Sequence, residues 1–126
     1  MTARLEHANY TVSDCAATAA WMSSLFGWHI RWQGDSIHEG KSVHVGTKDQ
    51  YLALYQPATN VRAQPDTYTC LAGLNHIAVV VHDLDATERA VRAHGFEPHS
   101  HQDYEPGRRF YFNDYDGIEY EVVQYN

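Results

Sequence analysis

Three residues of this sequence, His7, His76 and Glu121, are of the types that bind divalent metal ions. Two imidazoles and one carboxylate form a common ligand set for first-row metals, and they leave coordination positions open to water or substrate. Nine histidines and a 13% share of aromatic residues suit a metal site lined by rings with polar tips. The sequence therefore predicts a site for one divalent ion: Zn, Ni, Mn, Co or Fe.

The two histidines occupy equivalent positions of an internal repeat. The segments 5–14 and 74–83 align 69 positions apart, with Leu, His, Val and Asp coinciding, and the segments 51–56 and 119–124 align 68 positions apart. A repeat of this length is a structural module. We expect a pseudo-two-fold axis to bring His7, His76 and Glu121 together, with Ala53 at the vacant fourth ligand position.

Hydrophobic alternation and capping residues define the elements that position these ligands. We expect a strand over residues 5–12, a helix over 15–26 that begins after Asp14 and ends at Gly27, and strands over 28–33, 41–46 and 51–56. The pairs and triplets between these strands, Gly34-Asp35 and residues 47–49, have the chemistry of turns. The second half repeats this order, with a helix near 85–94 and a last strand over 119–124.

The expected fold class is α+β, with two tandem βαβββ modules that form an open half-barrel around a metal and substrate cavity. The modules span about residues 3–56 and 72–125 of a single domain, 1–126, and residues 57–71 form a linker that is either a solvated connection or a lid over the site. At 126 residues the chain is long enough for one compact domain.

The repeated pattern His-x-x-x-x-Val-x-Asp and the motif Asp114-Tyr-Asp-Gly117-Ile-Glu-Tyr-Glu121 resemble the vicinal oxygen chelate superfamily, over essentially the whole chain. This superfamily includes glyoxalase I, fosfomycin thiol transferases, extradiol dioxygenases and bleomycin-resistance proteins. The resemblance implies that His7, His76 and Glu121 are metal ligands. Tyr115 stands where the family more often has Pro, which is a conservative departure for a turn.

The departures from the family pattern bear on the reaction. Glyoxalase I-like proteins carry a carboxylate where this chain has Ala53, which argues against a four-ligand glyoxalase I and favours the three-ligand pattern of lyases, dioxygenases or transferases. Gln56 lies on the opposite face of its strand and is not expected to bind the ion. Asn9 replaces the Thr of the fosfomycin enzymes, and their basic tail is missing, so fosfomycin modification is not favoured.

Strand parity places further residues on the same face as the ligands. We expect Tyr111 to be catalytic, and the substrate to be bound by a set of polar and aromatic residues: Asn9, His44, Tyr51, Arg109 and Glu119, with Tyr55 on the same face. The histidines at 29, 38, 82, 94, 99 and 101 are expected in loops, on helices or on the outer face.

Charge and composition limit the partners. A net charge of −7 without a basic stripe is unsuited to nucleic acid or anionic membranes, and neither a signal peptide nor an apolar span is expected. With only Cys15 and Cys70 and no motif spacing, we expect a cytoplasmic protein. The resemblance implies a homodimer that acts on a small chelating substrate. The alternative is a metal-free protein that sequesters an aromatic ligand or antibiotic between Tyr51, Tyr111 and Trp32.

Overall fold

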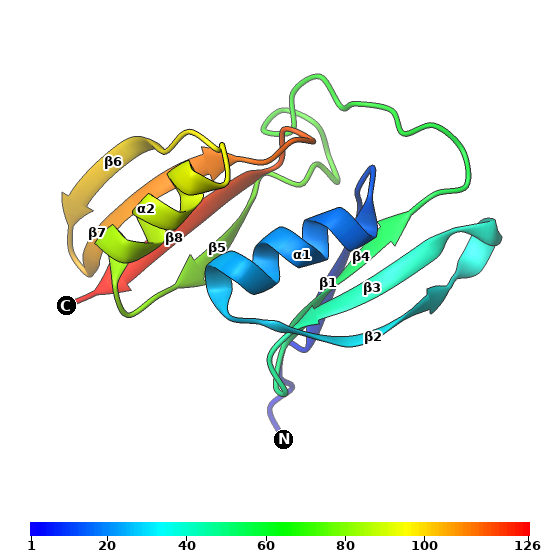
Figure 1. The fold of residues 1–126 in the computed structure, drawn as a ribbon, viewed down its shortest axis with the longest axis horizontal. Coiled ribbons are helices and arrows are strands. Elements are labelled where there is room, and N and C mark those ends of the chain that lie inside the picture. The colour runs from blue at the N-terminus through cyan, green and yellow to red at the C-terminus, as the bar shows by residue number, and fades with distance from the viewer. The chain divides into compact units, whose positions relative to one another are not determined.

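The computed structural model describes all 126 residues, which form two compact units, Met1–Ala63 and Gln64–Asn126. The first unit, module 1, consists of β1 (His7–Thr11), α1 (Cys15–Phe26), β2 (His29–Asp35), the short 3₁₀ helix η1 (Ile37–Glu39), β3 (Lys41–Gly46) and β4 (Tyr51–Gln56). The second unit, module 2, consists of β5 (His76–Val80), α2 (Leu84–Ala93), β6 (His99–Tyr104), β7 (Gly107–Asn113) and β8 (Glu119–Tyr125). Each module is shown in Figure 1 with its helix against one sheet.

The two sheets have the same topology. The strand order is β1-β4-β3-β2 in module 1 and β5-β8-β7-β6 in module 2. In each sheet the first strand of the module pairs in parallel with the last, and the other neighbours are antiparallel. Both sheets are open and mixed, so the predicted α+β class with two βαβββ modules is confirmed.

Both helices begin at an aspartate, as the repeat predicts. The Asp14 carboxylate accepts a hydrogen bond from the Ala17 amide at 3.0 Å, and Asp83 accepts one from the Ala86 amide at 3.0 Å. These bonds satisfy amide donors that have no partner inside the helix. The helix α1 ends at Gly27, whose φ of 71° suits a residue without a Cβ. The predicted bounds 15–26 are confirmed.

A glutamine at the end of each module ties the last strand to the start of the helix. The Gln56 side-chain oxygen accepts a hydrogen bond from the Cys15 amide at 3.0 Å, and the Gln124 oxygen accepts one from the Leu84 amide at 2.8 Å. Gln56 is therefore turned toward the helix, as predicted from its strand parity. The coincidence of the two glutamines in the repeat has a structural cause, because both fix the helix on the sheet.

The predicted turn at Gly34-Asp35 is wrong, because both residues belong to β2. A Cβ at position 34 would come within 2.9 Å of the Trp32 ring, so the glycine makes room for a neighbouring side chain. The chain reverses later, through η1, where His38 and Glu39 adopt left-handed φ values of 55° and 62°.

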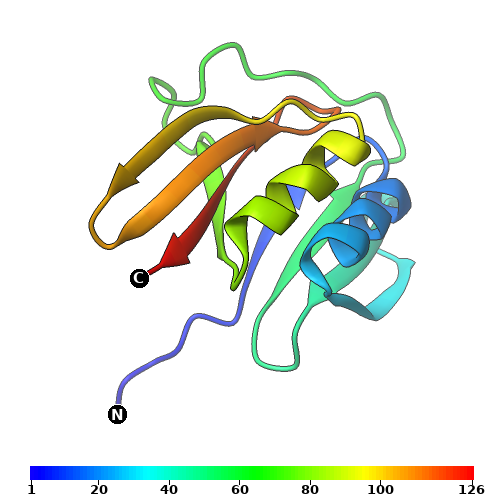
Figure 2. The same ribbon diagram turned by 60° about the vertical axis from the view of Figure 1, so that its left-hand side comes forward.

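The cores between helix and sheet differ between the modules. Module 1 buries mainly aliphatic side chains, among them Met22, Val43, Val45 and Leu54. Module 2 buries a group of aromatic rings, Phe96, Phe110, Phe112 and Tyr120, in which Phe112 stacks on Phe96 and Tyr120 at centroid distances of 5.6 and 5.4 Å. In the view of Figure 2, α2 lies along the sheet of its own module. The opposite face of each sheet carries the candidate ligands.

Candidate metal centre

One face of the module 2 sheet gathers most of the predicted site residues. Register pairs His76 with Glu119 and Tyr111 with Glu121, so these four side chains point to the same side of the sheet. His76 and Glu121 are the predicted ligands of this module. Their nearest atoms, Nε2 and Oε1, are 3.3 Å apart. The prediction that the residues share one face is confirmed within this module.

The two oxygens of Glu121 have different partners. Oε1 lies toward His76, whereas Oε2 accepts a hydrogen bond from Arg109 Nη1 at 2.9 Å. Both side chains of this ion pair are about nine-tenths buried. Arg109 also donates from Nη2 to the Gly107 carbonyl at 3.2 Å, and its guanidinium lies 4.3 Å from the centre of the Tyr104 ring. Arg109 therefore holds the carboxylate in place.

The second ring nitrogen of His76 is held by a tyrosine that the sequence analysis did not select. The Tyr68 hydroxyl lies 3.1 Å from His76 Nδ1 and donates a hydrogen bond to Glu119 Oε1 at 2.8 Å. The hydrogen bond to Glu119 raises the pKa of Tyr68 to about 12, so the phenol keeps its proton at neutral pH. A hydroxyl that donates to Glu119 can accept from His76 in the tautomer that carries its hydrogen on Nδ1.

In module 1, His7 is held by a carboxylate directly. His7 Nδ1 lies 2.8 Å from Glu6 Oε1, and this hydrogen bond lowers the pKa of the Glu6 carboxyl. Tyr51 donates to the same oxygen over 3.4 Å. Since Nδ1 faces the carboxylate, Nε2 is the nitrogen of His7 that is left for a metal ion. The histidine side chain is 41% exposed, against 33% for His76.

Aromatic and cationic groups surround His7 on the module 1 sheet. The Tyr51 ring is stacked with those of His7 and His44 at centroid distances of 4.8 and 4.9 Å, and Trp32 lies 5.1 Å from His44. The Arg31 guanidinium lies 4.1 Å from the Tyr51 ring centre. Burial lowers the pKa of His44, so this ring is a neutral surface at physiological pH.

The vacant position at Ala53 is closed by its neighbours. Ala53 is 5% exposed and pairs with Asn9 on one side and His44 on the other. The Asn9 side-chain amide donates to the Ala53 carbonyl at 2.9 Å. The hydroxyl of Tyr55 donates to the Ile37 carbonyl at 2.8 Å and thus secures η1.

The prediction for His99 is wrong, because this residue lies on the site face of module 2. Its ring is stacked on Tyr111 at a centroid distance of 6.4 Å, and Nε2 lies 2.8 Å from the Asn113 side-chain oxygen. A register shift between His99 and Gln102, where Ser100 has a φ of 57°, changes the side-chain alternation of β6. Parity counted along the sequence could not detect this irregularity. Burial raises the pKa of the neighbouring Tyr111.

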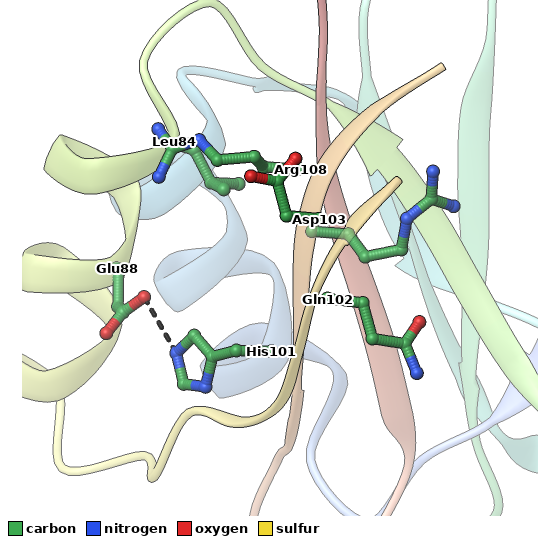
Figure 3. A pocket seen from close by; sticks show the side chains of 7 residues that line it. Leu84, Glu88, His101, Gln102, Asp103 and Arg108 are labelled. Atoms are coloured by element: carbon green, nitrogen blue, oxygen red, sulfur yellow. Dashed lines mark hydrogen bonds and ion pairs between the residues drawn. The ribbon is translucent and has the colours of Figure 1, made fainter. Parts of the chain in front are cut away.

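A separate cavity of about 260 Å³ opens beside α2 and the β6–β7 hairpin. Figure 3 shows Glu88 and His101, which both line this cavity, pointing toward each other. The distance between His101 Nε2 and Glu88 Oε1 is 3.0 Å. Glu88 also pairs with Arg92 at 3.3 Å, and Arg108 pairs with Asp85 at 3.3 Å. Glu88, Arg108 and Arg109, which line this cavity, are thus each paired with a residue of opposite charge.

The family model for the Glyoxalase/Bleomycin resistance protein/Dioxygenase superfamily matches residues 4–122, and the chain belongs to this superfamily. The family predicted from the repeated motifs is therefore confirmed. A comparison with functionally curated proteins found no match. None of the helices has the length and apolar composition that crossing a membrane requires.

Solved structures with the same fold come from several bacteria. A glyoxylase/bleomycin resistance protein/dioxygenase domain from Frankia sp. EAN1pec has a TM-score of 0.83 at 19% identity, over 100% of this chain and 94% of that one. A mutant of the fosfomycin resistance protein FosX from Listeria monocytogenes, complexed with Mn(II) and 1S,2S-dihydroxypropylphosphonic acid, scores 0.72 at 18% identity, over 98% and 93%. The antibiotic binding protein TnmS3 from Streptomyces sp. CB03234 scores 0.74 at 19% identity, over 99% and 98%.

Proposed function

We propose that the protein is a divalent-metal-dependent enzyme that acts on a small substrate with chelating oxygens, and that His7, His76 and Glu121 bind the ion. The observation that carries this proposal is the approach of His76 Nε2 to Glu121 Oε1 at 3.3 Å. Two ligand atoms that each lie about 2.1 Å from one ion, at near-tetrahedral angles, are separated by roughly 3.4 Å. The pair fits a shared ion without rearrangement.

The hydrogen bonds of the two histidines support the same assignment. Metal-binding histidines commonly donate their other ring N–H to an oxygen acceptor, which orients the ring and fixes its tautomer. Here Nδ1 of His7 faces Glu6, and Nδ1 of His76 faces Tyr68. Each ring therefore offers Nε2. No three His, Cys, Asp or Glu side chains of the structure are grouped as a metal site, so the assignment of His7 as the third ligand rests on the repeat and on the family motif.

A bound ion would act as a Lewis acid that polarises an oxygen of the substrate. The chain's own residues would complete the site. Arg109 is paired with the Oε2 atom of Glu121, and the Oε1 atom lies toward His76. Tyr111, whose pKa is raised by burial, keeps its phenolic proton and is the proposed catalytic donor to a substrate oxygen. Asn9, His44, Tyr51 and Glu119 are the proposed substrate contacts.

The decisive experiment measures metal in purified protein by elemental analysis after loading with Mn(II), Ni(II) or Zn(II) and gel filtration. We expect about one equivalent in the wild type and none in Glu121→Gln, which keeps the shape of the side chain but removes its charge. The matched control is Glu97→Gln, because the Glu97 side chain is 83% exposed and is paired with Arg92, away from the candidate ligands. Equal metal contents in wild type and Glu121→Gln would refute the ligand assignment.

A second function is supported by the exposed rings of module 1. Trp32, His44, Tyr51 and His7 form a row across four neighbouring strands, and Trp32 is 46% exposed. Such a row can bind a planar aromatic ligand by stacking. The alternative is thus a metal-free protein that sequesters an antibiotic or another aromatic compound. Thermal shifts distinguish the two, because a ligand stabilises only the protein that binds it. Stabilisation by aromatics alone would favour sequestration, and stabilisation by metal ions would favour the enzyme.

We also propose that the working form is a homodimer in the cytoplasm. Both cysteines are free thiols, which suits a reducing compartment. Light scattering coupled to gel filtration tests the dimer, and fractionation of the source cells tests the compartment. A monomer at micromolar concentration, or recovery outside the cytoplasm, would refute the respective part.

A further inference from the structure

We infer that Tyr68 is a positioning residue of the proposed metal centre. Through Tyr68, docking of the linker turn onto the sheet would increase metal affinity, and a bound ion would stabilise the docked turn. The inference rests on the proposed function, since it concerns the same ligand, His76. Tyr68 lies outside the repeated strands and helices, on the turn that follows Pro65 and Asp66. Neither the repeat nor the family motif assigns it a role.

The Tyr68 hydroxyl forms two hydrogen bonds, and their directions determine which nitrogen of His76 carries the hydrogen. Tyr68 has one proton, which it gives to Glu119 at 2.8 Å, so the oxygen of Tyr68 accepts from His76 Nδ1 at 3.1 Å. This arrangement leaves Nε2 as the ligand nitrogen and points it at Glu121. Without the hydroxyl, the imidazole could rotate about its side-chain bonds or carry its hydrogen on Nε2, and either change would remove the lone pair from the site.

The turn that carries Tyr68 has hydrogen bonds of its own. The Asp66 carboxylate accepts from the Tyr68 amide at 3.1 Å, and the Gly73 amide donates to the Cys70 carbonyl at 3.0 Å. A Cβ at position 73 would lie 2.4 Å from the Thr67 carbonyl, so the turn closes tightly there. Tyr68 itself is 61% exposed. The hydroxyl, with its two hydrogen bonds, attaches this exposed residue to the sheet.

A coupling between the turn and the ion follows from linkage. If the hydrogen bond to Tyr68 favours the ligand orientation of His76, it increases metal affinity by some factor. By thermodynamic reciprocity, the bound ion must stabilise the docked turn by the same factor. From the sequence, the linker could be either a lid or a solvated connection. The coupling favours the lid, a segment that closes onto the centre when metal binds.

The first measurement is metal affinity, by competition of Zn(II) or Mn(II) with a chromophoric chelator. We expect Tyr68→Phe to weaken binding by about 10- to 100-fold, the usual effect of removing a hydrogen bond to a ligating histidine. The matched control is Tyr125→Phe, because Tyr125 is an exposed residue at the end of β8. In a His76→Ala background, Tyr68→Phe should have no further effect, because a residue that acts through His76 loses its influence with it.

The second measurement is hydrogen exchange of the amides between residues 66 and 73, with and without Zn(II). Docking should slow their exchange, added metal should slow it further, and Tyr68→Phe should abolish the effect of metal. An unchanged affinity in Tyr68→Phe, or an equal loss in the His76→Ala background, would overturn the inference while leaving the metal site intact. If wild type binds no metal at all, the proposed function fails, whatever the behaviour of Tyr68.

Discussion

The two modules share the interactions that fix their backbone but differ in the side chains of their cores and sites. Each begins its helix at an aspartate, secures the helix with a glutamine from the last strand, and arranges its four strands in the same order. The largest fully buried side chains of module 1, Met22 and Leu54, have no rings, whereas those of module 2, Tyr120, Phe110 and Phe112, are aromatic. The two copies therefore retain what fixes the fold and diverge in how they fill it.

The groups around the two histidines show the same divergence. On the Nδ1 side, His7 and His76 are each accompanied by one glutamate and one tyrosine, but with exchanged roles. In module 1 the glutamate, Glu6, bonds the ring and the strand position carries Tyr51. In module 2 the strand position carries Glu119, and the tyrosine comes from the linker. The repeat thus orients Nε2 of both rings by two different routes.

The largest expected effect is a difference in stability loss between core substitutions in the two modules. Phe112→Ala should lower the free energy of unfolding by about 3–5 kcal/mol, because it removes a fully buried ring. Leu54→Ala, at a fully buried site of module 1, should cost less, since stacked ring pairs contribute about 0.5–1.5 kcal/mol beyond burial. Urea unfolding followed by circular dichroism measures both. A larger loss in Leu54→Ala would contradict the importance assigned to the aromatic stacking.

The next effect concerns the two histidines. His76→Ala should weaken metal binding by more than about 100-fold, since losing a ligand should exceed the loss of a hydrogen bond to it. His7→Ala should cost less, because it leaves His76 and Glu121 arranged 3.3 Å apart. Chelator competition measures both affinities. The comparison of the modules would fail if His7→Ala were the more damaging change.

The shared glutamines should behave alike. Gln56→Ala and Gln124→Ala each leave a helix amide without its acceptor, so each should lower stability by about 1–2 kcal/mol. Gln→Glu at either position retains an acceptor oxygen and places a negative charge near the helix N-terminus, so it should cost less. Thermal unfolding at constant pH measures all four variants. Unequal effects of the two alanine changes would show that the bonds are not equivalent.

Much of the fold could be predicted from the sequence because the modules repeat local signals. Asp14 and Gly27 mark the ends of α1, and alternating residues mark β3 and β4 at their observed bounds. The face shared by His76, Glu121 and Tyr111 followed from strand parity alone. These features depend on capping residues and residue alternation, which are local in the sequence and occur in both modules.

The missed features depend on contacts between residues far apart in the chain. Gly34 is a residue type common in turns, yet position 34 requires glycine because a Cβ there would come too close to the Trp32 ring. His99 was assigned to the wrong face because the irregularity in β6 shifts the alternation. Tyr68 lies in a linker without periodicity, and only the folded turn brings its hydroxyl to His76. Linker tyrosines that follow a Pro-Asp pair would have been the signal to weigh.

The smallest expected effect is a pH dependence of stability, which arises at the turn before the last strand of module 2 and not of module 1. In module 1 the neutral Thr47 hydroxyl lies 3.3 Å from the amides of Asp49 and Gln50. In module 2 the Asp114 carboxylate accepts from two amides at 2.9 and 3.0 Å and from the Tyr120 hydroxyl at 3.1 Å. Only module 2 therefore has a buried ionisable group at this turn, and burial raises the pKa of Asp114.

The raised pKa makes stability depend on pH in a defined direction. Between the unfolded value of 3.8 and the higher folded value, the folded state binds a proton at Asp114 that the unfolded state does not bind. Stability from this group is therefore greatest at low pH and falls as pH rises through the folded pKa, by at most about 1.4 kcal/mol per pH unit. Relative to Asp114→Asn, the wild type should gain stability as the pH is lowered from 7 toward 4. Urea unfolding of both proteins across this range measures the difference, and a gain with rising pH would contradict the assigned cause, since hydrogen bonds to the carboxylate would then outweigh its burial.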